Sequence, residues 1–163
     1  MEQVFDNHIK FPNSRLTELG FNDETINFLT NNGLPNWCAP NIHFGEEDSW
    51  LPQISNQGNL LTVIGSDRDD SPICINKALN VVRIKNNSEE FMASNLELLY
   101  SALINFQKCI NGAVLENDNA FVDNNIPEKY LMPFVTWLKS NEPKALKANS
   151  FWGQTLSWLK YAI

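Results

Sequence analysis

Three short apolar segments in the middle of the chain, separated by polar turns, most constrain the fold. The first is an apolar run at residues 60–64 that Gly65 ends. In residues 73–75 and 81–85, hydrophobic side chains recur at every second position. A period of two is typical of strands, and such short connections favour antiparallel neighbours. The sequence therefore predicts an antiparallel meander, with a last edge strand at residues 91–94.

A long amphipathic helix is predicted directly after these strands. Ser94 or Asn95 can cap its first turn, and the Asn-Gly pair at 111–112 is expected to end it. Apolar residues separated by three and four positions form one stripe, which faces the core. The residues of this stripe are Leu96, Leu99, Leu103, Phe106 and Ile110.

Shorter elements are predicted on either side of this central region. A helix capped by Asn22 or Asp23 ends at Gly33, and residues 34–59, with three prolines, look irregular apart from a strand at 42–44. After a polar loop at 116–126, a helix that follows Pro127 should kink or start again at Pro133. Residues 151–161 have the spacing of a last helix.

The expected fold class is α+β, with a curved antiparallel sheet of about four to six strands packed against N-terminal, long central and C-terminal helices. The 163 residues are the length of one domain. We expect an extended lead-in over residues 1–13 and a single globular core over residues 14–163.

The charge balance is acidic, with 12 Lys and Arg against 19 Asp and Glu. Most of the excess lies in residues 41–123, which hold 12 acidic and 5 basic residues. Phosphate contacts need Lys and Arg, so direct binding to nucleic acid is not expected, whereas a basic protein partner is favoured. Three widely spaced cysteines, no signal-peptide pattern and no long apolar run predict a cytoplasmic protein without membrane contact.

Two acidic segments are the candidate partner-binding sites. Acidic side chains steer a basic partner, and an exposed Trp can anchor it. The alternative interpretation is that both segments are solvated turns. The candidate residues are Glu46, Glu47, Asp48 and Trp50 in one segment and Asp67, Asp69 and Asp70 in the other.

A catalytic Cys38–His43 pair is the main enzymatic alternative. Nucleophilic catalysis by cysteine needs a thiolate, a base within reach and an orienting third group. Cys38 lies in a proline-bounded loop without a nearby cation, and strand alternation should direct His43 away from Ile42 and Phe44. We therefore expect a packed cysteine and a half-exposed histidine, and no enzyme.

Metal and cofactor sites have no matching pattern in the sequence. The two His and three Cys are scattered and offer no closely spaced pair of zinc ligands. The turn at 67–70 lacks the Gly and Glu of an EF-hand loop, and no glycine-rich nucleotide motif occurs. We expect no catalytic residue, no metal and no cofactor.

Several short segments follow one another in an order that points to one family. They are Gly-Leu-Pro at 33–35, Gly-Ser-Asp at 65–67, Val-Val-Arg-Ile at 81–84, Phe-x-x-Ser at 91–94, Glu-Pro at 142–143 and Phe-Trp at 151–152. In their order and spacing, from about Leu16 to Leu159, the chain resembles the SUKH superfamily of bacterial immunity proteins, and its fourth group most closely.

This resemblance implies an α+β fold and a role in a polymorphic-toxin system. Such an immunity protein binds a cognate toxin, often a nuclease or nucleic-acid deaminase, and occludes its active site. An acidic surface suits the basic cleft of such a toxin. The alternative is a non-catalytic adaptor of the same fold that binds proteins or peptides. The sequence leaves the oligomeric state open.

Overall fold

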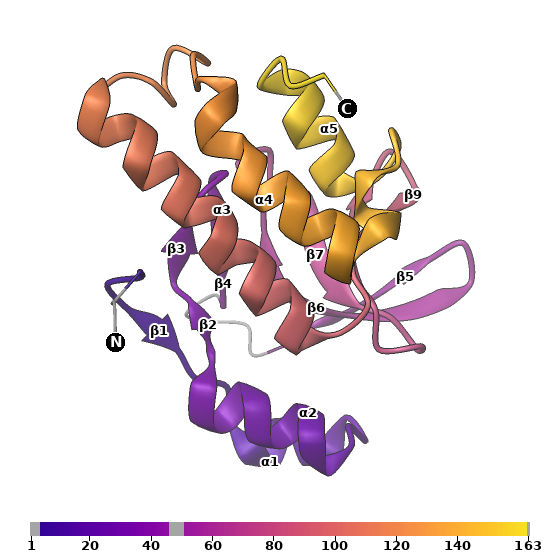
Figure 1. The fold of residues 1–163 in the computed structure, drawn as a ribbon. Coiled ribbons are helices and arrows are strands. Elements are labelled where there is room, and N and C mark those ends of the chain that lie inside the picture. Colours follow the sequence, from indigo (N-terminus) through magenta and orange to yellow (C-terminus); the bar gives the residue numbers. More distant parts are fainter. Residues whose placement is uncertain (1–3, 46–50, 163) are drawn as a thin grey trace.

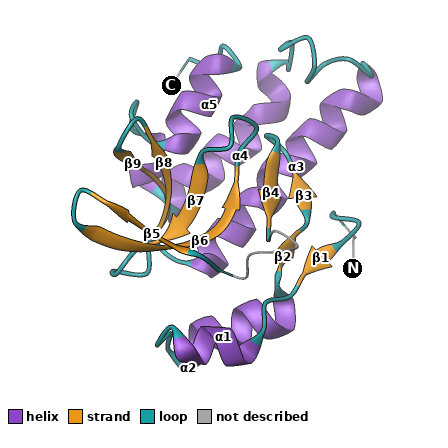
Figure 2. Ribbon diagram, turned by 180° about the vertical axis from the view of Figure 1, so that it is seen from behind, coloured by secondary structure: helices purple, strands orange, loops and turns teal. Residues whose placement is uncertain are grey.

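The structure is a computed structural model that describes residues 4–45 and 51–162. An antiparallel sheet forms one layer, and the helices of the C-terminal half cover one of its faces (Figure 1). Seen from behind, the other face of the sheet lies in front of these helices (Figure 2). The predicted α+β class, with N-terminal, central and C-terminal helices, is therefore confirmed.

The main sheet has seven strands in the order β3-β4-β6-β7-β8-β9, with β5 paired to β6. Two further strands, β1 and β2, pair separately beside the N-terminal helices. The segment 34–59, expected to hold one strand, therefore contributes four. The bounds are β1 His8–Ile9, β2 Leu34–Pro35, β3 Trp37–Cys38, β4 Ile42–Phe44, β5 Gln53–Asn56, β6 Asn59–Ser66, β7 Pro72–Ile75, β8 Val81–Lys85 and β9 Ser88–Ala93.

The N-terminal helices have five or six residues each, whereas the two longest helices follow the sheet in the sequence. Within the described ranges, none of them combines the length and the apolar composition of a membrane span. Their bounds are α1 Asn13–Glu18, α2 Asp23–Asn27, the π-helical turn η1 Phe28–Asn32, α3 Leu96–Glu116, α4 Glu128–Asn141, the 3-10 turn η2 Pro143–Leu146 and α5 Phe151–Trp158.

Gly65 does not end its strand, contrary to the prediction. β6 continues through Gly65 to Ser66, with an irregular register beside β7 between Val63 and Gly65. A Cβ atom at Gly65 would lie 2.3 Å from the carbonyl oxygen of His43 on β4. The glycine is therefore needed for the close approach of β4, because no larger residue fits between the two backbones.

The central helix α3 begins as predicted but ends later. The Asn95 side chain accepts a hydrogen bond from the Leu98 backbone N–H at 2.8 Å, and the predicted apolar stripe is buried. The expectation that Gly112 ends the helix is wrong, because α3 continues to Glu116. A Cβ at Gly112 would lie 3.2 Å from the Tyr130 ring, so the glycine serves packing against α4.

α4 starts at Glu128, before Pro133, which lies inside the helix. The predicted restart at Pro133 is therefore wrong, and Pro127 precedes the first turn as expected. α3, α4 and α5 meet in an aromatic core around Trp152, which is fully buried. Its ring centroid lies 4.9 Å from Phe134 and 5.2 Å from Phe106.

The sheet curls so that the turns of two hairpins touch. The side-chain amides of Asn56 and Gln57, in the β5–β6 hairpin, donate to the Asn87 carbonyl oxygen in the β8–β9 turn, at 3.3 and 2.9 Å. A second hydrophobic cluster lies in this part of the sheet, separate from the main core. It consists of Ile54, Leu61, Val63, Cys74, Val82 and Ile84.

Candidate functional site

Asp67 is buried, with 7% of its surface exposed, although we expected it on an exposed acidic turn. Its Oδ1 atom accepts hydrogen bonds from the backbone N–H groups of Asp69 and Ser71, both at 2.9 Å. Its Oδ2 atom lies 3.1 Å from Nη1 of Arg83. Asp67 therefore stabilises the β6–β7 turn and forms a buried ion pair. The expectation of an exposed side chain is wrong for this residue.

Asp69 and Asp70 are exposed at the same turn and fit the expected acidic surface. Asp70 has a φ of 61°, in the left-handed region that Asp and Asn tolerate best. The other predicted segment, Glu46, Glu47, Asp48 and Trp50, lies outside the described residues. Of the seven predicted partner-binding residues, Asp69 and Asp70 are therefore the two that the structure describes as exposed.

Arg83 forms a buried polar network that the sequence analysis did not anticipate. It bonds Asp67 on one side and Glu90, on β9, on the other, with 2.8 Å between its Nη2 and the Glu90 carboxylate. Its guanidinium carbon lies 4.8 Å from the centre of the Phe151 ring. Gln154 on α5 also donates to Glu90. The network therefore joins the sheet to the C-terminal helix.

A second polar contact joins the end of β9 to the end of α4. The Glu142 carboxylate accepts hydrogen bonds from the backbone N–H of Ser94 at 3.2 Å and from its hydroxyl at 3.1 Å. Glu142 is 3% exposed, and the two residues are separated by 48 positions in the sequence. Ser94 and Glu142 therefore fix the long central helix to the helix that follows it.

Cys38 and His43 do not form a catalytic pair. Cys38 pairs with Ile42 across β3 and β4, whereas His43 pairs with Trp37. Because neighbouring residues of a strand point to opposite faces, the thiol and the imidazole lie on different sides of the sheet. Cys38 is fully buried, and burial raises its pKa to about 12. At neutral pH the thiol is protonated and cannot act as a nucleophile.

We expect Cys38 and Cys74 in the folded protein to resist alkylation. Burial raises the pKa of each thiol from 9.0 to about 12, so at about pH 8 the thiolate fraction is about a thousandfold lower than in an ordinary cysteine. Iodoacetamide labelling followed by mass spectrometry measures the rate, with the urea-unfolded protein as control. Labelling of folded Cys38 at the unfolded rate would contradict this account.

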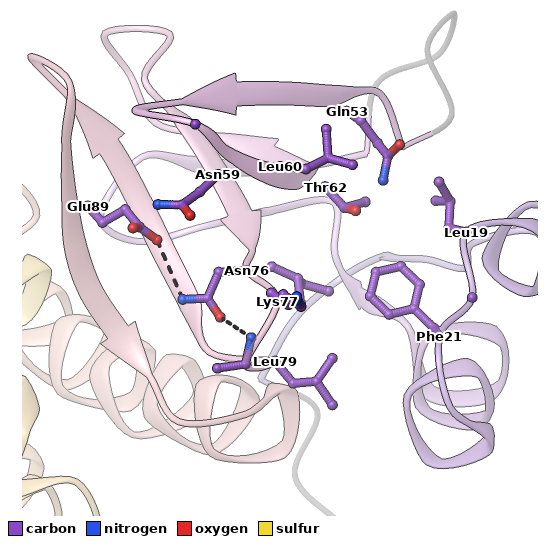
Figure 3. Close-up of a pocket in the computed structure, with 14 residues that line it drawn as sticks. Leu19, Phe21, Gln53, Asn59, Leu60, Thr62, Asn76, Lys77, Leu79 and Glu89 are labelled. Atoms are coloured by element: carbon purple, nitrogen blue, oxygen red, sulfur yellow. Dashed lines mark hydrogen bonds between the residues drawn. The ribbon is translucent and has the colours of Figure 1, made fainter.

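A large open groove lies between the N-terminal helices and the β5–β6 hairpin (Figure 3). Its volume is about 730 Å³. One wall is the α1–α2 connection with Leu19 and Phe21, and the other is formed by Leu60 and Thr62 of β6. Leu79, in the β7–β8 turn, closes one end. Concave surfaces with mixed apolar and polar lining are typical binding sites.

The groove presents apolar side chains together with hydrogen-bonding groups. Leu60 is 59% exposed, which is high for a large apolar residue beside a concave surface. Asn76 holds the β7–β8 turn through its side-chain oxygen and also donates to Glu89 at 3.5 Å. Among the described lining residues, Lys77 and Glu89 are the charged ones. This composition suits binding of a protein segment.

A smaller hollow adjoins the groove and shares Ile75 and Leu79 with it. Glu24 of α2 and Glu97 of α3 also line this hollow, which has a volume of about 110 Å³. The two hollows form one continuous surface, here called the Leu60 groove. The sequence carries no local signal for this surface, because it joins four separate segments of the chain.

Across residues 4–45 and 51–162, no group of three His, Cys, Asp or Glu side chains has the arrangement of a metal site. Comparisons with protein-family models, with curated proteins and with solved structures found no match to this chain.

Proposed function

We propose that this protein is an immunity protein of the SUKH kind, which binds a cognate toxin and occludes its active site. One observation carries the proposal: five of the six short segments behind the family resemblance contact another of them in space. Asp67, from Gly-Ser-Asp, pairs with Arg83, from Val-Val-Arg-Ile, and Arg83 lies over Phe151, from Phe-Trp. Ser94, from Phe-x-x-Ser, bonds Glu142, from Glu-Pro. Segments that lie far apart in the sequence are therefore joined by polar and ring contacts in the fold.

The acidic character of the chain supports the same proposal. A toxin that acts on nucleic acid has a basic cleft for phosphate, and an acidic protein can fill such a cleft. The net charge of −7 and the exposed pair Asp69 and Asp70 favour fast, steered association with it. In this proposal the protein acts in the bacterial cytosol, without a catalytic residue, a cofactor or a metal of its own.

Co-expression with the product of a neighbouring gene tests the proposal. We expect that product alone to arrest growth of the host, and this protein to restore growth and to co-purify with it in a fixed ratio. Restored growth without a complex would exclude neutralisation by direct binding. Arrest that this protein does not relieve would contradict the proposal.

Reversing the charge of Asp69 and Asp70 to lysine should slow association with the toxin about three- to tenfold at low salt, because steering depends on unpaired surface charge. The rate can be measured by stopped-flow fluorescence at two ionic strengths, since screening removes the difference at high salt. Asp118 and Asp123, also exposed, provide a matched control with the same change of charge. Equal rates for the two variants would exclude steering by the β6–β7 turn.

The Leu60 groove favours one alternative, a non-catalytic adaptor that binds peptides. An adaptor would bind several partners with modest affinity and would not protect a host from any toxin. The survival assay separates the two functions, because protection is expected only of an immunity protein.

A further inference from the structure

The Leu60 groove combines an exposed large apolar side chain with a concave surface. Leu60 exposes 59% of its surface at one wall, and Leu19 and Phe21 face it from the other wall (Figure 3). A buried apolar anchor surrounded by a polar rim is the usual centre of a protein–protein contact. The groove therefore has room and chemistry for a large apolar side chain of another protein.

The rim of the groove is acidic. Glu89 lies at the groove itself, and Glu24 and Glu97 line the adjoining hollow, against the single cation Lys77 among the described lining residues. All three glutamates are exposed, and none takes part in the ion pairs described for this chain. Three carboxylates against one ammonium group attract a cation to this rim.

We infer that the Leu60 groove binds a basic segment of the partner protein, in which an apolar side chain enters the groove and flanking Lys or Arg residues meet the rim. The apolar side chain packs between Leu60 and Phe21. The cations lie near Glu89 at one side and near Glu24 and Glu97 at the other. This inference deepens the proposed function and rests on it for the identity of the partner as a toxin.

Selection from a phage-displayed library of random dodecapeptides tests the groove without the toxin. The immobilised full chain is the bait. We expect enriched peptides to combine an aromatic or large aliphatic residue with neighbouring Lys or Arg. Enriched peptides without an excess of basic residues, or no enrichment, would overturn the inference.

Two groove variants and one control assign the peptides to the groove. Leu60→Ser removes the exposed apolar side chain from one wall of the groove, and the double change Glu24→Lys with Glu89→Lys reverses part of the rim. Each should weaken binding of a synthetic enriched peptide about tenfold or more in a fluorescence anisotropy titration. Leu115→Ser is the matched control, since Leu115 is 89% exposed on α3 and lies outside the groove. Equal affinity of the groove variants and the unmodified protein would overturn the inference.

The same variants separate this inference from the proposed function. If a toxin complex forms and Leu60→Ser leaves it unchanged, the groove is not the toxin contact and the immunity function stands. If basic peptides bind the groove while no neighbouring product arrests growth, the groove stands and the toxin assignment fails.

Discussion

Replacing Arg83 with leucine should lower the free energy of unfolding by about 3–5 kcal/mol, the usual cost of removing one member of a buried ion pair. The guanidinium group lies between two buried carboxylates, at 3.1 Å from Asp67 and 2.8 Å from Glu90. Without it, both carboxylates stay in the interior with no cation beside them. Urea unfolding followed by tryptophan fluorescence measures the change.

Two controls make this result specific. Arg68 is exposed within the β6–β7 turn, so Arg68→Leu should change stability by no more than about 0.5 kcal/mol. A triple variant with Asp67→Asn, Arg83→Met and Glu90→Gln removes all three charges together and should recover part of the loss. If Arg83→Leu proved as mild as Arg68→Leu, the network would not stabilise the fold.

The second large effect is expected at Trp152. Its side chain is fully buried among Phe106, Phe134 and Phe151, with ring centroids between 4.9 and 5.2 Å away. Trp152→Ala removes most of this contact and leaves a cavity, which typically costs about 3–5 kcal/mol. The loss can be measured by the same urea titration.

The indole nitrogen of Trp152 gives this test a sharp comparison. Its N–H is buried and, among the residues that the structure describes, has no hydrogen-bond partner, so Trp152→Phe removes a polar group without such a partner while keeping an aromatic ring. The phenylalanine variant should therefore lose clearly less stability than the alanine variant. Trp158→Ala, at a side chain 47% exposed, should also cost less. A Phe variant as unstable as the Ala variant would contradict this account, because the retained ring would then contribute nothing to stability.

The sheet and the long helix were predictable because their signals are local. The alternation of apolar and other side chains in residues 73–75 and 81–85 involves only neighbouring residues. The apolar stripe from Leu96 to Ile110 lies within a single helix. Gly65 and Gly112 were misjudged for the opposite reason. Each is a glycine because a distant backbone or ring comes close, at His43 and at Tyr130, and such tertiary contacts leave no trace in a local pattern.

The candidate surfaces were predictable only in part. Composition placed acidic residues at the β6–β7 turn, but it could not tell exposed Asp69 from buried Asp67, because the difference depends on Arg83 sixteen positions away. An arginine at an inward-facing position of an alternating strand is a signal for a buried carboxylate partner. The Leu60 groove had no sequence signal, since its walls come from separate parts of the chain.

The contact between the two hairpin turns determines which of its positions can vary during evolution. Both amides, from Asn56 and Gln57, donate to the main-chain carbonyl oxygen of Asn87, which every amino acid retains. The side chain at position 87 therefore takes no part in these two hydrogen bonds. The choice of residue there is limited by the φ of 63°, which favours Asn, Asp or Gly. Related sequences that keep the curl should conserve an amide at position 56 or 57 and a left-handed residue at position 87.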